Sequence, residues 1–292
     1  MSIQRRTILG LGAAAAVGAG GHLLGAGSAL AAPAPTQQQY GVGVRRYEWD
    51  RDGRPLNTYI YYPSTEGAGG DVIEDAPIAE GAFAVYNYTH GFGSDPQGSE
   101  FFIRPLAAAG FIVPAPHFEY DGAGEVWSGE PSKDVSEIIT QTLALNEADD
   151  PLAGHIDETP GVGVSGHSLG GMTTHGLLSA WPDERITSAN PQSCEEMGDP
   201  ADSVSAKVVF VHGDQDDLTR YESARDAYDA LSAPKAFLTF VGGDHTSFWG
   251  DDRFPNTVVD WALWSLYDDT EAKDRLEEDA AGDDTEWEFV EE

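Results

Sequence analysis

The sequence is poor in cysteine. Cys194 is the only cysteine among 292 residues, so the chain can form no disulfide within itself. Roughly 235 residues of patterned sequence are nevertheless ample for one buried hydrophobic core. We therefore expect Cys194 to be an ordinary small side chain of that fold and not a nucleophile.

Positive charge is scarce as well. The sequence holds 16 Lys and Arg, of which four are Lys, against 50 Asp and Glu, and its formal net charge is −34. This balance excludes a nucleic-acid partner, because phosphate binding needs positive charge, and an anionic membrane surface would repel the chain. Self-repulsion destabilises such a chain at low salt and is screened by added salt. We therefore expect a salt-adapted protein.

The two ends of the chain differ in composition from the middle. Residues 1–31 begin with the pair Arg5 and Arg6, continue as a modest Ala/Gly/Leu run and end in Ala-Leu-Ala, which is typical of a cleaved export signal of the twin-arginine type. Residues 268–292 carry 13 acids, and such a run predicts a disordered acidic tail. The sequence therefore predicts a secreted protein without a stable membrane anchor.

The middle of the chain contains a Gly-x-Ser-x-Gly motif. Residues 162–171 read VGVSGHSLGG, a short apolar run followed directly by helix-forming sequence. This context predicts a sharp strand-to-helix turn that exposes the hydroxyl of Ser168, since Gly166 and Gly170 bring no Cβ into the turn. We expect the neighbouring His167 to pack or hydrogen-bond beneath the turn.

An acid and a histidine follow this serine in the order that a serine hydrolase requires. Residues 207–217 (KVVFVHGDQDD) read as a strand that runs into an acidic loop, and residues 236–245 (AFLTFVGGDH) as a strand that ends at His245. We expect His245 to be the general base that activates Ser168. Asp216 is the preferred acid because it fits a Gly-x-x-Asp pattern, while Asp217 and Asp214 of the same loop remain open.

Two backbone N–H groups would stabilise the oxyanion of such a reaction. Leu169, directly after the serine, supplies one, and Phe92 in the strand-loop sequence AVYNYTHGFG (84–93) supplies the other. Aromatic side chains in nearby loops are expected to line an apolar substrate groove. These groove residues are Phe92, Tyr120, Trp127 and Phe248.

Strand-like and helix-like segments alternate through the middle of the chain. The strands are expected at 44–49, 56–62, 82–89, 110–115, 161–166, 207–212 and 236–241, and the helices at 97–109, 132–147, 169–181, 218–231 and 255–267. The alternation predicts an α/β fold with a mostly parallel sheet covered by helices on both faces. The first two strands, separated only by a turn, are expected to pair antiparallel. One domain at 32–267 accounts for all of these segments, with no insertion long enough to form a lid.

Residues 63–81 are rich in glycine, alanine and acids and read as a surface loop. The acids Asp71, Glu74 and Asp75 could bind calcium, but a solvated loop is the preferred interpretation.

These motifs together resemble a known group. The resemblance runs from about residue 45 to 266 and rests on RDGRPL (51–56), YIYYP (59–63), THGFG (89–93), LAAAGFIVPAP (106–116), PLAGHID (151–157) and GHSLGG (166–171). They look like the dienelactone-hydrolase-like branch of the α/β-hydrolases, which includes bacterial relatives of plasma platelet-activating-factor acetylhydrolase and has polyester-cleaving cutinases as neighbours. The resemblance implies the α/β-hydrolase fold and ester hydrolysis without a metal or an organic cofactor. A serine in place of the cysteine of true dienelactone hydrolases argues against lactone opening.

The sequence therefore predicts a secreted, monomeric serine carboxylesterase that acts on neutral short- or medium-chain esters. A cutinase-like polyester hydrolase is the nearest alternative. A binding module without activity on the same fold is the alternative from another class of function.

Overall fold

The computed structural model describes residues 39–232 and 234–292, and ten of its strands form one sheet in the order β10-β9-β8-β7-β6-β4-β5-β2-β1-β3. The strands are β1 (Gly41–Arg51), β2 (Arg54–Ser64), β3 (Ile73–Glu74), β4 (Phe83–Thr89), β5 (Phe111–Pro116), β6 (Ile156–His167), β7 (Ile186–Gln192), β8 (Lys207–Gly213), β9 (Lys235–Phe240) and β10 (Thr285–Val290). From β5 through β4 and β6 to β9 the neighbouring strands run parallel. The pairs β1–β2, β2–β5 and β9–β10 are antiparallel.

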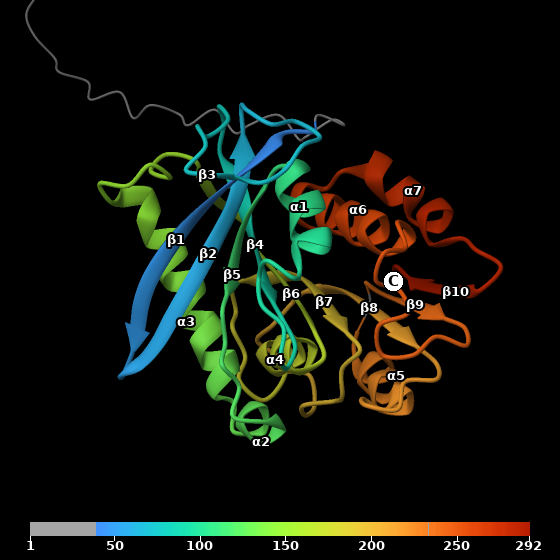
Figure 1. The fold of residues 1–292 in the computed structure, drawn as a ribbon. Helices are drawn as coiled ribbons and strands as arrows, with labels where there is room; N and C mark the ends of the chain where they lie inside the picture. The colour runs from blue at the N-terminus through green and yellow to red at the C-terminus, as the bar shows by residue number, and fades with distance from the viewer. Residues whose placement is uncertain (1–38, 233) are drawn as a thin grey trace, which may run out of the picture. The chain divides into compact units, whose positions relative to one another are not determined.

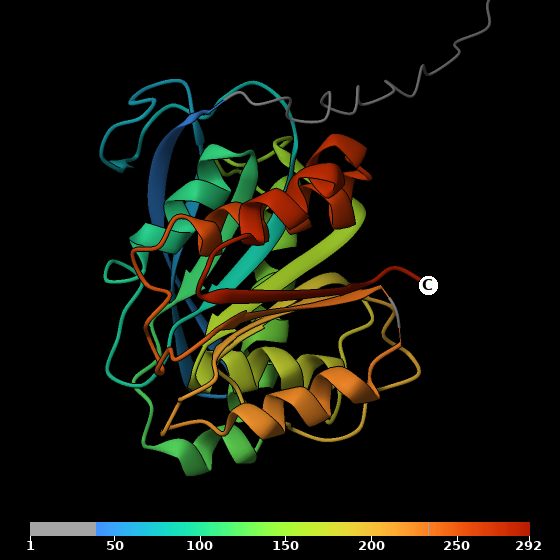
Figure 2. The same cartoon turned by 90° about the vertical axis from the view of Figure 1, so that its right-hand side faces the viewer.

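Helices cover both faces of this sheet, as Figures 1 and 2 show. The helices are α1 (Glu100–Ala108), α2 (Ala123–Trp127), α3 (Glu130–Ala144), α4 (Leu169–Leu178), α5 (Tyr221–Ala230), α6 (Arg253–Tyr267) and α7 (Thr270–Ala280). Helices α1 and α6 pack on one face, and α3, α4 and α5 pack on the other. Because both faces are covered, side chains on both sides of a central strand can be buried, and every residue of β4 is buried.

The α/β class expected from the sequence is confirmed. Each expected strand and helix is present, with ends that differ by a few residues. The antiparallel pairing of the first two strands is confirmed too, with Asp50 opposite Pro55. Asp52 and Gly53 both have positive φ at the turn between them, as tight hairpin turns require.

Strand β7 is the central strand that the sequence pattern does not reveal. Its sequence ITSANPQ is mostly polar and contains a proline, which weakens the strand signal. The fold compensates with side-chain hydrogen bonds, because Asn190 donates to the carbonyl oxygen of Val209 at 2.8 Å and Gln192 donates to Asn190 at 2.7 Å. Buried polar side chains are therefore tolerated in the middle of the sheet.

The expectation of a disordered tail at 268–292 is wrong. The segment forms helix α7, capped by Asp269, and edge strand β10, and both belong to the same compact unit as the sheet. The rings of Trp287 and Phe289 pack against the core, and Glu288 pairs with Arg225 at 2.5 Å. The acids dominate the composition, but the apolar side chains that alternate with them in β10 determine the structure.

Among residues 39–232 and 234–292, no helix is both long enough and apolar enough to cross a membrane. The export signal expected at residues 1–31 lies outside the described part of the chain and stays a prediction.

Candidate active site

The loops that carry the expected site leave the carboxyl ends of β4, β6, β8 and β9. The chain passes from β4 to β5 on one side and then returns to place β6 on the other side of β4. Such a reversal leaves a crevice beyond the carboxyl ends of the strands. The loop after β4 and the turn after β6 border this crevice.

Ser168 occupies the turn between β6 and α4. Its backbone angles are φ 58° and ψ −120°, a conformation that costs free energy for any residue with a side chain and is retained mainly at functional sites. The turn is closed by close backbone contacts, since a Cβ at Gly170 would collide with the carbonyl oxygen of Thr89 and one at Gly166 with the carbonyl of Gly170. The two flanking glycines therefore have the role that the motif predicts.

Asp216 and His245 lie together across the loops after β8 and β9. The Nδ1 atom of His245 is 2.7 Å from Oδ2 of Asp216, and the carboxylate is fully buried. Asp217 is exposed, and Asp214 instead accepts a hydrogen bond from the backbone N–H of Gly242 at 2.6 Å. Of the three acids left open by the sequence, Asp216 is the one in contact with His245.

Asp216 accepts hydrogen bonds at both of its oxygens. Oδ2 is 3.1 Å from Nε2 of His212 and accepts from the hydroxyl of Thr219 at 2.8 Å, while Oδ1 accepts the N–H groups of Leu218 and Thr219. Burial by itself would raise the pKa of Asp216, but the hydrogen bonds from His212 and His245 outweigh it and hold the pKa far below its usual range. The carboxylate is therefore charged at neutral pH and aligns the ring of His245.

The backbone of His245 is fixed from the side of the serine turn. Its carbonyl oxygen is 2.9 Å from Nε2 of His167 and accepts the hydroxyl of Ser193 at 3.1 Å. Burial, followed by the nearby His245, lowers the pKa of His167 to about 3, so its ring is neutral and donates one N–H to that carbonyl. His167 lies beneath the turn and hydrogen-bonds there, as the sequence predicts. Because His167 precedes Ser168, this bond ties the two loops together.

The loop after β4 contacts the serine turn directly. A Cβ on Gly91 would lie 2.9 Å from Cβ of Ser168. Among the hydrogen bonds of the described residues, the N–H groups of Phe92 and Leu169 are not donors to any protein group. Neither N–H group predicted for the oxyanion hole is therefore occupied by another described residue.

His90 holds this loop in place, a role that the sequence analysis missed. Its Nδ1 is 2.7 Å from the carbonyl oxygen of Gly91, and its Nε2 accepts the N–H of Phe118 at 3.0 Å. Burial lowers the pKa of His90, so the ring is a neutral bridge between the loops after β4 and β5. The hydroxyl of Tyr120 adds a bond to the His90 carbonyl oxygen at 3.1 Å.

The aromatic groove is only partly as expected. Phe92 and Trp127 are exposed and Tyr120 is half-buried, but Phe248 is fully buried against Phe240 and Phe254. Phe248 is therefore a core residue, and its assignment to the groove is wrong. The side chains that the expectation missed are Trp249, which lies over the His167 ring and is 38% exposed, and Leu218, which is 74% exposed.

Metal ligands do not gather in the described part of the chain. Within residues 39–232 and 234–292, no group of three or more His, Cys, Asp or Glu has an arrangement that could hold a metal ion. Glu74 and Asp75, considered for calcium, are paired with Arg46 and Arg45 instead. Cys194 is buried, and burial raises the pKa of its thiol, so it is a poor nucleophile.

The best-formed hollows of the described residues do not include Ser168 or His245 in their walls. Ser168 is partly exposed and the side chain of His245 is 12% exposed, so both residues reach the surface outside these hollows.

Comparisons with known proteins do not identify a family for this chain. No protein-family model matches the sequence, and a search of curated proteins finds no match.

Proposed function

We propose that this chain is a serine carboxylic ester hydrolase with the α/β-hydrolase fold, similar to the dienelactone-hydrolase-like esterases. The observation that carries the proposal is the strained backbone of Ser168, whose turn the His167–His245 bond joins to the Asp216–His245 pair. Unused N–H groups at Leu169 of the same turn and at Phe92 of the adjoining loop accompany it. A mostly parallel sheet with the serine at a strand-to-helix turn supports it. Neutral esters of short- or medium-chain acids are the proposed substrates, because the acidic chain repels anions.

In the proposed first step, Ser168 Oγ attacks the ester carbonyl carbon while its proton passes to Nε2 of His245. The hydroxyl has to rotate toward this nitrogen, since none of the hydrogen bonds between the described residues joins the two groups. The N–H groups of Phe92 and Leu169 stabilise the oxyanion, and the buried carboxylate of Asp216 stabilises the imidazolium. Collapse of the intermediate transfers the proton to the leaving alcohol and forms an acyl-serine.

The second step repeats the same proton movements with water. His245 removes a proton from a water molecule that attacks the acyl carbon, and it then returns that proton to Ser168 Oγ as the carboxylic acid leaves. Ser168 is partly exposed, so water can reach the acyl-serine. No group other than those of the chain and water is needed to balance the reaction.

Hydrolysis of p-nitrophenyl esters from acetate to palmitate tests the proposal, measured on the chain from Ala32 onward in low and in molar NaCl. We expect turnover that is highest for short or medium acyl groups and that rises with salt, together with a melting temperature that rises with salt. Ser168→Ala should lose activity by about ten-thousand-fold or more at an unchanged melting temperature. Activity that falls steadily with salt would refute the salt adaptation but not the esterase.

A polyester substrate is the second candidate. Phe92, Leu218 and Trp249 are exposed apolar side chains on three loops that carry the site, and such a rim suits an insoluble neutral substrate. Release of soluble monomers from a polyester film, absent with Ser168→Ala, distinguishes this candidate from a simple esterase. A folded protein that hydrolyses no ester at any chain length or salt concentration would instead favour the binding-module alternative.

Export by the twin-arginine route is part of the same proposal. Replacement of both Arg5 and Arg6 by Lys should leave active enzyme inside the producing cell, whereas the parent chain should reach the exterior. Equal export of both chains would point to an ordinary secretory signal.

A further inference from the structure

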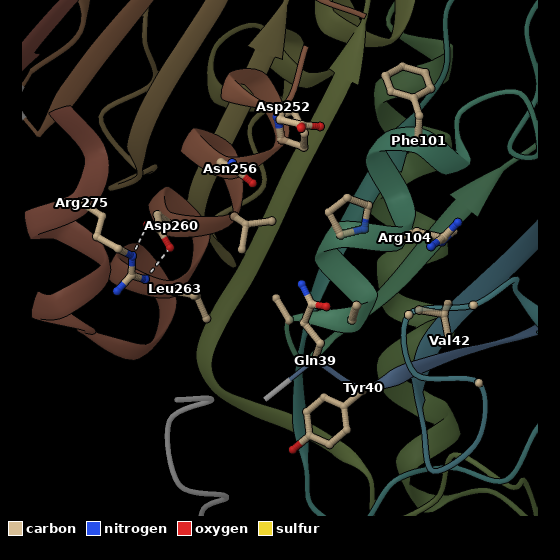
Figure 3. A pocket seen from close by; sticks show the side chains of 18 residues that line it. Gln39, Tyr40, Val42, Phe101, Arg104, Asp252, Asn256, Asp260, Leu263 and Arg275 are labelled. Carbon is tan, nitrogen blue, oxygen red and sulfur yellow. Dashed lines mark hydrogen bonds and ion pairs between the residues drawn. The ribbon is translucent and has the colours of Figure 1, made fainter. Parts of the chain in front are cut away.

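A hollow separate from the triad lies between α1, α6, the segment 39–42 and the loop 67–70 (Figure 3). Its volume is about 540 Å³, within the range of small-molecule sites. Apolar side chains form part of its walls, among them Phe101 and Pro105 of α1 and Val259 and Leu263 of α6, and polar side chains such as Gln39 and Asn256 form the rest. An alkyl chain is the kind of group that such walls would bury.

Arg104 of α1 brings to this hollow a positive charge that no described residue neutralises through an ion pair. Among the described residues, Arg104 is the one Arg or Lys side chain that takes part in neither an ion pair nor a hydrogen bond, although the sequence holds 50 acids. The acid one helical turn earlier, Glu100, is instead engaged by the hydroxyl of Tyr61 at 3.2 Å. A free guanidinium beside apolar walls favours a ligand with a carboxylate at the end of an alkyl chain.

The acids of the same hollow lie on its other side (Figure 3). Asp252 and Asp260 belong to α6, whereas Arg104 projects from α1. Asp260 is neutralised by Arg275, which binds both of its oxygens at 2.7 Å. The carboxylate of a ligand would therefore lie at Arg104, away from the acids of α6.

We propose that this hollow binds an aliphatic carboxylate of medium chain length, with its charge at Arg104 and its chain between α1 and α6. The binding follows from the hollow itself, whereas the source of the ligand rests on the proposed function, since ester hydrolysis releases acids of this class. Two aromatic contacts connect the wall of the hollow with the candidate active site. The ring centroids of Phe101 and Trp249 are 5.3 Å apart, and those of Trp249 and His167 are 4.7 Å apart.

Calorimetric titration of decanoate into the Ser168→Ala protein at one fixed NaCl concentration tests the site. We expect saturable binding that is weakened about tenfold by Arg104→Gln and less by Arg104→Lys, which keeps the charge but loses the planar fork. Decanol and butyrate should each bind at least tenfold more weakly than decanoate, because one lacks the charge and the other the chain. Arg46→Gln, which removes an exposed arginine outside this hollow, should leave the affinity unchanged.

A second variant tests the walls instead of the charge. Ala108→Leu places a larger side chain in the hollow and should weaken decanoate binding while p-nitrophenyl ester turnover of the Ser168-containing protein stays the same. Unchanged affinity in Arg104→Gln would overturn the proposal and would place Arg104 among the acids of the adjoining hollow, which Asp71 and Glu74 line. Absence of saturable binding in the parent would overturn it too. Neither result depends on whether the chain hydrolyses esters.

Discussion

Two aspartates of this protein are removed from water in different surroundings, one at the candidate active site and one where α7 packs on α6. The fully buried carboxylate of Asp216 accepts bonds from three side chains and two backbone N–H groups, and its pKa is lowered. Asp279 is partly buried beside Asp260, and its Oδ2 has no partner among the described residues. Burial first, and then the neighbouring Asp260, raises the pKa of Asp279 to about 7.

The comparison shows that burial alone does not decide the charge of a carboxyl group. Desolvation raises the pKa in both places, and hydrogen-bond donors reverse the sign only at Asp216. At the candidate active site, hydrogen-bond donors therefore keep the carboxylate of Asp216 charged. At the α6–α7 contact, the carboxyl group of Asp279 has too few donors and loses its proton only near neutrality.

The largest expected effect comes from removing the charge of Asp216. Asp216→Asn keeps the shape but gives the ring of His245 a neutral partner, which leaves the imidazolium unstabilised. If the proposed function holds, kcat should fall by about ten-thousand-fold, measured with a p-nitrophenyl ester. The matched variant Asp217→Asn, at the exposed neighbour, should change kcat little. A larger loss of kcat in Asp217→Asn than in Asp216→Asn would show that Asp217, and not Asp216, is the acid of the site.

A smaller effect is expected from the donors to Asp216. His212→Leu removes the N–H at 3.1 Å from Oδ2, so the carboxylate keeps more negative charge for His245 and is held less firmly. We expect kcat/KM to fall by about ten- to a hundredfold, and the acid limb of its pH profile to move to higher pH.

His212→Gln is the matched variant, because its amide can still donate to Asp216, and it should recover part of the lost activity. If His212 is only a packing residue, then Leu, which is similar in size, should conserve the activity and the pH profile, and this outcome would contradict the positioning role.

The positions of some residues of the candidate site could be predicted from the sequence, and those of others could not. Ser168, Asp216 and His245 follow strands in a fixed order, and each lies at a strand end, so the motif and the order predict their places in the fold, whereas their catalytic roles stay part of the proposal. His90 acts through a contact between the loops after β4 and β5, and no spacing along the chain encodes that distance. His212 and Thr219 lie in the same segment as Asp216, but an irregular loop has no period from which the directions of their side chains could be read.

Burial in irregular loops was equally hidden from the sequence. Phe248 and Trp249 are neighbours in one loop, yet the first is in the core and the second is at the surface. Outside a strand or helix there is no period from which their directions could be read. The prediction for the tail failed for the opposite reason, because its acids obscured a regular alternation in β10 that partly buries Trp287 and Phe289.

The smallest expected effect concerns Asp279 and the stability of the α6–α7 contact. Its folded-state pKa of about 7 lies above the ordinary value of 3.8, so the group contributes stability that is fully present below about pH 4 and is lost as the pH rises through 7. Because Asp279 is only partly buried, solvent screening reduces this contribution to about 1 kcal/mol.

Asp279→Asn removes this titration, and it should raise the melting temperature at pH 8 by about 2–4 °C relative to the parent chain. At pH 4 the two chains should melt within about 1 °C of each other, because the parent's Asp279 is then protonated and neutral like the amide. Asp274→Asn on the same helix makes a matched surface control for the change in net charge. An equal stabilisation by both substitutions at pH 8 would show that general charge repulsion, and not the buried pair, accounts for the gain. The contrast between the donor-rich site of Asp216 and the donor-poor contact of Asp279 would then no longer hold.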